Sequence, residues 1–131
     1  MKKIILALFL GGVLGASEMV VSVDGAKFEG ELFENESANA FGDRFPLYAR
    51  MQPVSKDGKY FYSPEFIPGK SEKISQIHEG DVVLYDNRYV MIFTSDFAPS
   101  HAYARIGRIK NPANLRQLFE KNKVSIKFER K

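Results

Sequence analysis

Few side chains in this sequence have the types and spacing that catalysis or metal binding requires. The two histidines, His78 and His101, stand far apart and form no HxH or HExxH pattern, so a metal site is not expected. Ser100 directly precedes His101, but sequence neighbours rarely reach the geometry of a serine–histidine pair, and no GxSxG turn is present. Phosphate-cradling glycine motifs are also missing. We therefore expect no metal, no cofactor and no hydrolase chemistry.

A mixture of aromatic and basic residues around two irregular segments is more informative. Residues 63–76 and 95–102 lack periodicity and contain prolines, and long loops in a small domain often carry function. If the two segments meet over one face, they would build an apolar cleft with a cationic end, suited to a peptide or a small anionic ligand. Alternatively, these aromatics complete the core and cover the loops. The candidate ligand-binding residues of these segments and their flanks are Tyr62, Phe66, Phe97, His101, Tyr103 and Arg105.

The elements that must position these residues are mostly strands. Runs of β-branched or alternating apolar residues predict eight of them, and Asp24-Gly25 between the first two runs predicts a hairpin with a type I′ turn. The expected strands cover residues 19–23, 26–32, 47–52, 59–62, 81–85, 89–94, 103–110 and 124–129.

Two short helices are expected between these strands. Asn35 would cap the first, which ends near Gly42, and Asn111 followed by Pro112 predicts the start of the second. Eight antiparallel strands in a chain of this length favour a closed barrel, because closure removes exposed edges. The predicted fold class is therefore mostly β: a closed eight-stranded antiparallel barrel capped at its open ends by two short helices.

The first 17 residues have the composition of a secretory signal peptide. Two lysines precede an uncharged apolar run that is shorter than the ~20 residues needed to cross a bilayer. Signal peptidase requires small side chains before the cut, which favours cleavage after Ala16 or Ser17; a retained anchor or a buried helix is the alternative. We expect residues 18–131 to form one extracytoplasmic domain, periplasmic or secreted, without a membrane partner.

Charge and cysteine content narrow the partners further. The chain has 19 Lys and Arg residues against 16 Asp and Glu, but Lys2 and Lys3 leave with the signal, so the net charge falls from +3 to +1 and nucleic acid is not expected. Acidic residues concentrate in 18–43 and basic ones in 101–131. Either the basic end meets an anionic partner, or the two ends lie side by side and neutralise each other. Without cysteine, disulfides and thiol chemistry are excluded, and we expect a single-domain monomer.

Three segments resemble the bacterial cyclophilin-like fold family. They are Glu79-Gly80-Asp81-Val82-Val83-Leu84-Tyr85, Val90-Met91-Ile92-Phe93 and Tyr103-Ala104-Arg105-Ile106-Gly107-Arg108-Ile109. The resemblance covers residues 19–130 and implies a cyclophilin-type barrel with two capping helices. It does not imply prolyl isomerase activity, because this family as a whole has no established reaction.

The same resemblance supplies a candidate catalytic residue. True cyclophilins carry a catalytic Arg on the strand after the first helix, within a Phe-His-Arg context, together with a Gln and several aromatics that shape a proline pocket. Arg50 matches the arginine's place and Gln52 lies on the same strand face. Tyr48-Ala49 replaces Phe-His, however, and the Gln-Gly-Gly stretch is missing. The resemblance implies a catalytic role for Arg50 and ligand binding by Gln52; alternatively, Arg50 is an exposed strand residue paired with an acid.

Three functions follow as hypotheses. The leading one is an exported binding module for a peptide or small ligand, and the second is a weak peptidyl-prolyl cis–trans isomerase that uses Arg50. The third is an interaction protein whose basic end, residues 121–131, meets an acidic partner through Lys123, Lys127 and Lys131.

Overall fold

The computed structural model of the protein describes residues 16–131. The core of the predicted signal peptide falls on residues 1–15, outside this described part, and Ala16 and Ser17 begin the first strand. The elements, in chain order, are β1 (Ala16–Val23), β2 (Ala26–Phe33), α1 (Glu36–Gly42), β3 (Leu47–Ser55), β4 (Gly58–Tyr62), β5 (Glu72–Lys73), β6 (Asp81–Tyr85), β7 (Tyr89–Phe93), β8 (Ala102–Ile109), α2 (Leu115–Leu118) and β9 (Val124–Arg130).

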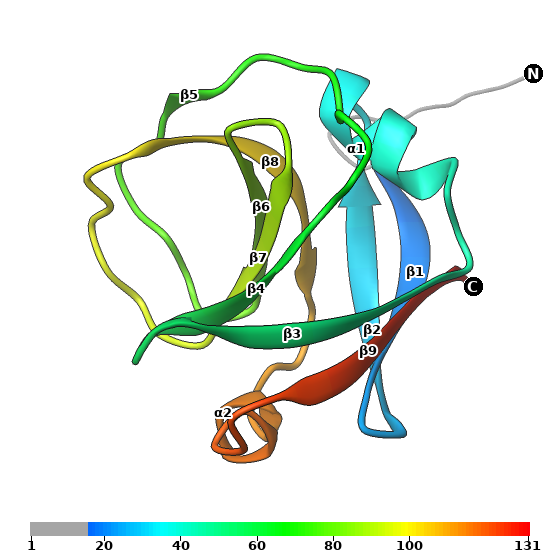
Figure 1. The fold of residues 1–131 in the computed structure, drawn as a ribbon, viewed down its shortest axis with the longest axis vertical. Coiled ribbons are helices and arrows are strands. Elements are labelled where there is room, and N and C mark those ends of the chain that lie inside the picture. Colours follow the sequence, from blue (N-terminus) through cyan, green and yellow to red (C-terminus); the bar gives the residue numbers. More distant parts are fainter. Residues whose placement is uncertain (1–15) are drawn as a thin grey trace, which may run out of the picture.

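Eight of these strands close into a barrel. Neighbours pair antiparallel in the order β2-β1-β9-β3-β4-β7-β6-β8, and β2 then pairs with β8 to complete the circle. The predicted closed eight-stranded barrel is thereby confirmed. Figure 1 shows α1 and α2 at opposite ends of it. The two-residue strand β5 was not predicted; it pairs with β8, where Glu72 is opposite Tyr103.

The first hairpin forms as its turn residues require. Val23 is paired with Ala26, which leaves a two-residue turn of Asp24 and Gly25 with φ of 49° and 92°. Both values lie in the left-handed region that a type I′ turn demands, and Asp and Gly are among the residues that tolerate it. The predicted hairpin is confirmed.

The two helices differ in how well the sequence located them. The side chain of Asn35 caps α1 by accepting a hydrogen bond from the backbone N–H of Ala38 at 2.8 Å. The predicted start of the second helix at Asn111 is wrong, because α2 begins at Leu115. The carbonyl of Pro112 instead accepts from the N–H of Leu115 at 2.9 Å, so a turn precedes the helix.

The core has two parts, one on each side of the barrel wall. Phe41, Phe61 and Phe128 belong to the large cluster inside the barrel. A second cluster lies outside and contains Ile77, Phe93 and other buried residues from β6, β7, β8 and the loops that cover them. These strands therefore carry apolar residues on both faces, which explains their unbroken apolar runs.

The two irregular segments meet over the outer face of the barrel. Ile77 and Phe97 form an antiparallel bridge, with their N–H and C=O groups bonded at 2.8 and 3.1 Å. The geometric condition for the predicted cleft is thus met. Within residues 16–131, no helix combines the length and the apolar character needed to cross a membrane.

Candidate functional site

A row of tyrosines crosses the outer face of four neighbouring strands. Tyr62 on β4 is paired with Tyr89 on β7, which is paired with Tyr85 on β6. Their ring centroids are 5.2 and 6.1 Å apart, and Tyr103 on β8 continues the row at 5.9 Å from Tyr85. Because alternate residues of a strand share one face, these rings all point away from the barrel interior. We call Tyr62, Tyr89, Tyr85 and Tyr103 the tyrosine row.

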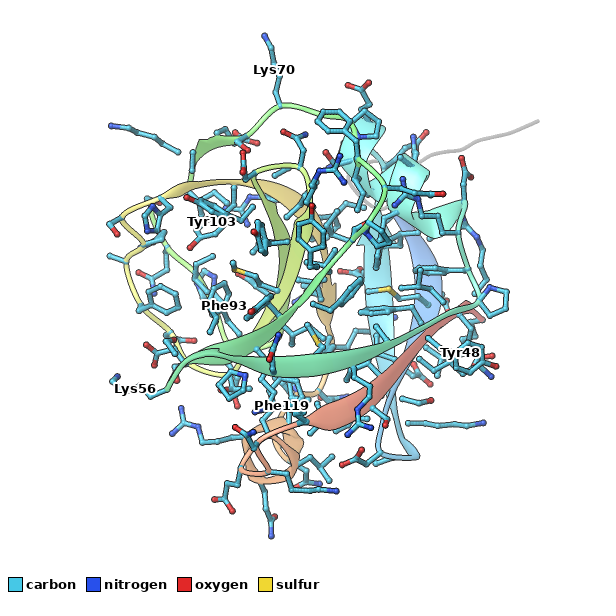
Figure 2. The ribbon with its side chains drawn as sticks, in the orientation of Figure 1. Tyr48, Lys56, Lys70, Phe93, Tyr103 and Phe119 are labelled. Carbon is cyan, nitrogen blue, oxygen red and sulfur yellow. The ribbon has the colours of Figure 1, made fainter. Side chains whose placement is uncertain are left out.

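Three further rings turn one end of the row into a recess. Phe93 lies 5.0 Å from Phe97 and 6.1 Å from Tyr103, and His101 lies edge-on to Tyr85 at 5.3 Å. The recess has a volume of about 290 Å³. Figure 2 shows Phe93 and Tyr103 on the side of the barrel that the two loops enclose.

A second recess adjoins the first and shares Val54, Tyr85 and Met91 with it. Its volume is about 510 Å³, and Tyr60 and Tyr89 also line it. We call the two together the aromatic groove. Val54 stands at the tip of the β3–β4 hairpin and is 42% exposed, although it is apolar.

A separate hollow surrounds the predicted catalytic arginine. Arg50 is exposed and lines a groove of about 450 Å³ together with Gln52 and Tyr62. We call it the arginine groove. Its loop wall is fixed by Arg44, whose guanidinium donates to the carbonyl of Phe66 at 3.0 Å. Gln52 donates to the hydroxyl of Tyr60 at 3.1 Å, so the arginine groove abuts the aromatic groove.

The structure divides the sequence-predicted site residues among several places. Phe97, His101 and Tyr103 line the first recess of the aromatic groove, whereas Arg50, Gln52 and Tyr62 line the arginine groove. Arg105 lies beside α1 and β5 in a small pocket of about 210 Å³. Phe66 is 58% exposed on its loop and lines neither groove.

Residues that sequence reasoning did not select form much of the aromatic groove. They are Val54, Tyr60, Tyr85, Tyr89 and Met91. A signal for two of them was present: Tyr85 and Tyr89 flank the tight turn of the β6–β7 hairpin, so they must be cross-strand neighbours on one face. Val54 gave no comparable signal, because its role depends on where the β3–β4 hairpin tip projects.

The groove offers tyrosine hydroxyls on a largely apolar floor, and Asp57 and Asp86 each line one of its recesses. Burial, and next the neighbouring Tyr85, raise the pKa of the Tyr103 hydroxyl, so this phenol stays protonated and can donate. Among the described residues, no three His, Cys, Asp or Glu side chains converge in a way that could hold a metal ion. The arrangement is suited to non-covalent binding of an apolar group whose polar atoms meet tyrosine hydroxyls.

The first and last strands of the described part of the chain lie side by side, as one of the two charge interpretations requires. β1 pairs with β9, and the ammonium of Lys131 contacts the carboxylates of Glu18 and Glu29 at 3.3 and 3.2 Å. Arg108 pairs with Glu31 at 2.7 Å. Of the lysines considered for an acidic partner, Lys127 and Lys131 are thus already paired with carboxylates, Lys127 with Glu129.

Comparisons with known proteins agree with this architecture. A family described as cyclophilin-like matches residues 21–129. The solution structure of a hypothetical protein from Archaeoglobus fulgidus is similar, with a TM-score of 0.68 and 20% sequence identity, over 89% of this chain and 96% of that one. At this identity the likeness concerns the fold alone. No curated protein matches the chain.

Proposed function

The chain belongs to the cyclophilin-like family, and from the groove on its barrel we propose that it is an exported binding module for a peptide or small ligand. Family membership supplies the fold and no reaction, so the proposal depends on the site itself. The aromatic groove is the observation that carries it: two adjoining recesses share Val54, Tyr85 and Met91.

The shape and composition of the groove favour an extended, largely apolar ligand. Volumes of about 290 and 510 Å³ fall in the range of ligand sites, which are concave and apolar with a few polar groups. Tyrosine rings supply a large contact area, lose little side-chain entropy and keep a hydroxyl for hydrogen bonds. Because the two recesses adjoin, successive side chains of one peptide could occupy both.

The alternative, that these aromatics only complete the core, accounts for part of the cluster. Phe93 and Tyr103 are almost fully buried beneath the loops. Val54, which lines both recesses, is not buried: 42% of its surface is exposed. Apolar side chains left in water beside a recess are typical of a surface that a ligand covers.

Binding can be tested with a panel of end-blocked tetrapeptides in which one central position is varied through all residue types. We expect amide NMR signals of Tyr85, Met91 and Phe93 to shift saturably with peptides that carry a large apolar side chain. A panel that perturbs no groove residue would contradict the proposal. Shifts confined to Arg50 and Tyr62 would instead favour the arginine groove.

Prolyl isomerisation is the second candidate, and the position of Arg50 favours it. Among residues 16–131, no carboxylate forms an ion pair with Arg50, which lines a groove together with Gln52 and Tyr62. After the Ser125 hydrogen bond and Lys121, its charge is a smaller cause of the lowered pKa of Asp24. An arginine fork next to an aromatic surface could hold a prolyl carbonyl while the amide twists. Exchange NMR on an end-blocked Ala-Ala-Pro-Phe peptide measures this activity directly. Equal exchange rates with and without the protein would exclude it for this peptide.

If isomerisation is found, the Arg50 variants decide where it occurs. Arg50→Ala should abolish it, and Arg50→Lys should restore little, because lysine keeps the charge and loses the planar fork. Full activity in Arg50→Ala would remove the arginine groove from the reaction.

Export is proposed from the composition of the N-terminus and has its own test. Expression with the full N-terminus in a Gram-negative host, followed by fractionation and N-terminal sequencing, should give a periplasmic protein that begins at Ser17 or Glu18. A cytoplasmic product that retains Met1 would contradict export and leave the binding proposal unaffected.

A further inference from the structure

One lysine of the barrel is buried. Lys59 follows Gly58 on β4 and is only 3% exposed. Its neighbour Tyr60 faces the aromatic groove, so by strand alternation Lys59 points to the inner side of the barrel wall, toward Phe119 at the end of α2. Its ammonium donates to the carbonyl of Asn122 at 2.9 Å and lies 5.8 Å from the centre of the Phe119 ring.

This ammonium is poorly compensated. The Lys59 ammonium has three N–H donors, and among the described residues it makes one hydrogen bond, to the carbonyl of Asn122. No described carboxylate forms an ion pair with it. Burial lowers the pKa of the Lys59 ammonium, because removal from water disfavours its charged form. A buried charge without a counter-charge is costly, and an anion that reached it would remove much of that cost.

A small pocket adjoins Lys59 and is rich in positive charge. Its volume is about 130 Å³, and Lys56 and Arg116 contribute two further cations against the single acid Glu120. Arg116 donates to the carbonyl of Thr94 at 3.0 Å and to the hydroxyl of Ser95 at 2.9 Å, and no described carboxylate pairs with it.

The pocket also holds a hydroxyl that can donate to an anion. The oxygen of Ser55 accepts a hydrogen bond from the N–H of Asp57 at 3.0 Å, so its own proton is free for another partner. Lys56 contributes less, because its side chain is 89% exposed and its ammonium pairs with Asp57 at 3.3 Å. Lys59, Arg116 and Ser55 therefore supply the donors that matter.

We propose that this pocket binds a small oxyanion, such as phosphate or the carboxylate of a small ligand, between Lys59 and Arg116. Ammonium and guanidinium donors together form charge-assisted hydrogen bonds to such an anion. The site is separate from the aromatic groove: the two meet only at Ser55, in the β3–β4 hairpin. It does not depend on peptide binding.

The competing explanation gives Lys59 a structural role only. Its bond to Asn122 connects β4 to the segment between α2 and β9, and this contact could position α2 without any ligand. The two explanations differ in what added anion does. If Lys59 is only structural, added anion should leave its NMR signal unchanged. If Lys59 binds the anion, its signal should shift saturably.

The test is a titration of the full domain with inorganic phosphate at constant ionic strength, with chloride as the balancing ion, followed by NMR of 13C-labelled lysine side chains. We expect the Lys59 Cε signal to shift saturably in the millimolar range and its pKa to rise on binding. Acetate in place of phosphate reports whether a carboxylate suffices. No saturable change at Lys59 with either anion would overturn the proposal.

Variants locate the site. Lys59→Met and Arg116→Gln should each weaken phosphate binding by roughly tenfold or more, the loss expected for one charged hydrogen bond. Glu120→Gln should strengthen binding, because it removes the pocket's only acid. Lys123→Gln, which removes an exposed charge close to Asn122 and outside the pocket, is the matched control and should bind normally.

Two results would contradict the assignment. One is unchanged phosphate affinity in Arg116→Gln. Because Arg116 is exposed, this variant should fold, so the test stays valid even if Lys59→Met does not fold. The other is equal weakening by Lys123→Gln, which would indicate general attraction to positive charge.

Discussion

Asp24 and Ser125 are 101 residues apart in the chain and hold each other by two hydrogen bonds at one end of the barrel. The Ser125 N–H donates to the Asp24 carboxylate at 2.9 Å, and the Asp24 N–H donates to the Ser125 carbonyl at 2.8 Å. Lys121 adds an ion pair to the same carboxylate at 3.1 Å. These contacts connect the turn between β1 and β2 to the start of β9.

Replacing Asp24 should weaken this connection. Asp24→Ala removes the acceptor of the Ser125 N–H and also places an alanine at a φ of 49°, so it should lower the free energy of unfolding by about 2 kcal/mol. Asp24→Asn keeps an acceptor oxygen and should cost less. Chemical denaturation followed by circular dichroism measures both, and equal stability of Asp24→Ala and the wild type would contradict the prediction.

The same carboxylate should make part of the stability depend on pH. The hydrogen bond from Ser125, and then Lys121, lower the pKa of Asp24 below its ordinary value of 3.8. A lowered carboxyl pKa stabilises the fold above the unfolded value and loses that contribution as the pH falls through the folded one. The difference in stability between wild type and Asp24→Ala should therefore be constant at neutral pH and shrink below about pH 4. A difference that stays unchanged down to pH 2 would contradict this.

Much of the fold could be predicted because its signals are local. Alternation and turn residues such as Asp24-Gly25 located the eight barrel strands, and the cap residue Asn35 located α1. Two features escaped. β5 has only two residues, too few for any periodicity. The start of α2 was placed too early, because an Asn-Pro pair is equally typical of a turn before a helix.

Gly107 lies at the seam where β8 closes the barrel against β2. It is paired with Leu32, and a Cβ atom at this position would overlap the carbonyl oxygen of Glu31. Gly107→Ala should therefore push the two strands apart and cost about 2 kcal/mol or more. Arg108→Ala is the neighbouring control: it removes an exposed ion pair with Glu31, and its loss should be below about 1 kcal/mol. Denaturant midpoints compare the two, and a smaller loss in Gly107→Ala than in Arg108→Ala would show that the seam yields easily.

The candidate site could be predicted less well than the fold, because recesses depend on contacts between distant segments. Tyr103 and Arg105 share a face of β8 and are only two residues apart. Tyr103 nevertheless lines the aromatic groove, whereas Arg105 lies in a pocket beside α1 and β5. The bridge between Ile77 and Phe97 determines which loop residues reach the groove, and no local pattern encodes that pairing.

Tyr85 should contribute most to ligand affinity if the aromatic groove is the binding site. Its ring contacts His101, Tyr89 and Tyr103 and lines both recesses. Tyr85→Ala should weaken binding of the tightest peptide from the panel by roughly tenfold or more, as expected for a central aromatic anchor. Tyr85→Phe, which keeps the ring, should bind almost normally. Phe66→Ala removes an exposed ring outside both grooves and is the control; an equal loss in Phe66→Ala would place the ligand elsewhere.

Lys59 should make stability rise with pH in a window where most lysines do not. Burial lowers its pKa below 10.5 in the folded chain, so between the lowered value and 10.5 the unfolded chain binds the additional proton. The free energy of unfolding therefore increases with pH across that window. Below the window Lys59 is charged in both the folded and the unfolded chain, and the folded protein bears the full cost of burying the charge. Glu129 raises the pKa of Lys127, and Glu29 and Glu18 raise that of Lys131, so these two lysines act in the opposite direction. Comparing wild type with Lys59→Met cancels the effects of Lys127 and Lys131, because both proteins contain these two lysines.

In chloride buffer at neutral pH, Lys59→Met should be as stable as the wild type or more stable by about 1 kcal/mol, since methionine keeps the packing of the stem without a buried charge. This advantage should diminish as the pH approaches 10.5. Thermal unfolding between neutral and alkaline pH measures it, and a difference that does not change with pH would show that the Lys59 charge is well solvated in the folded protein.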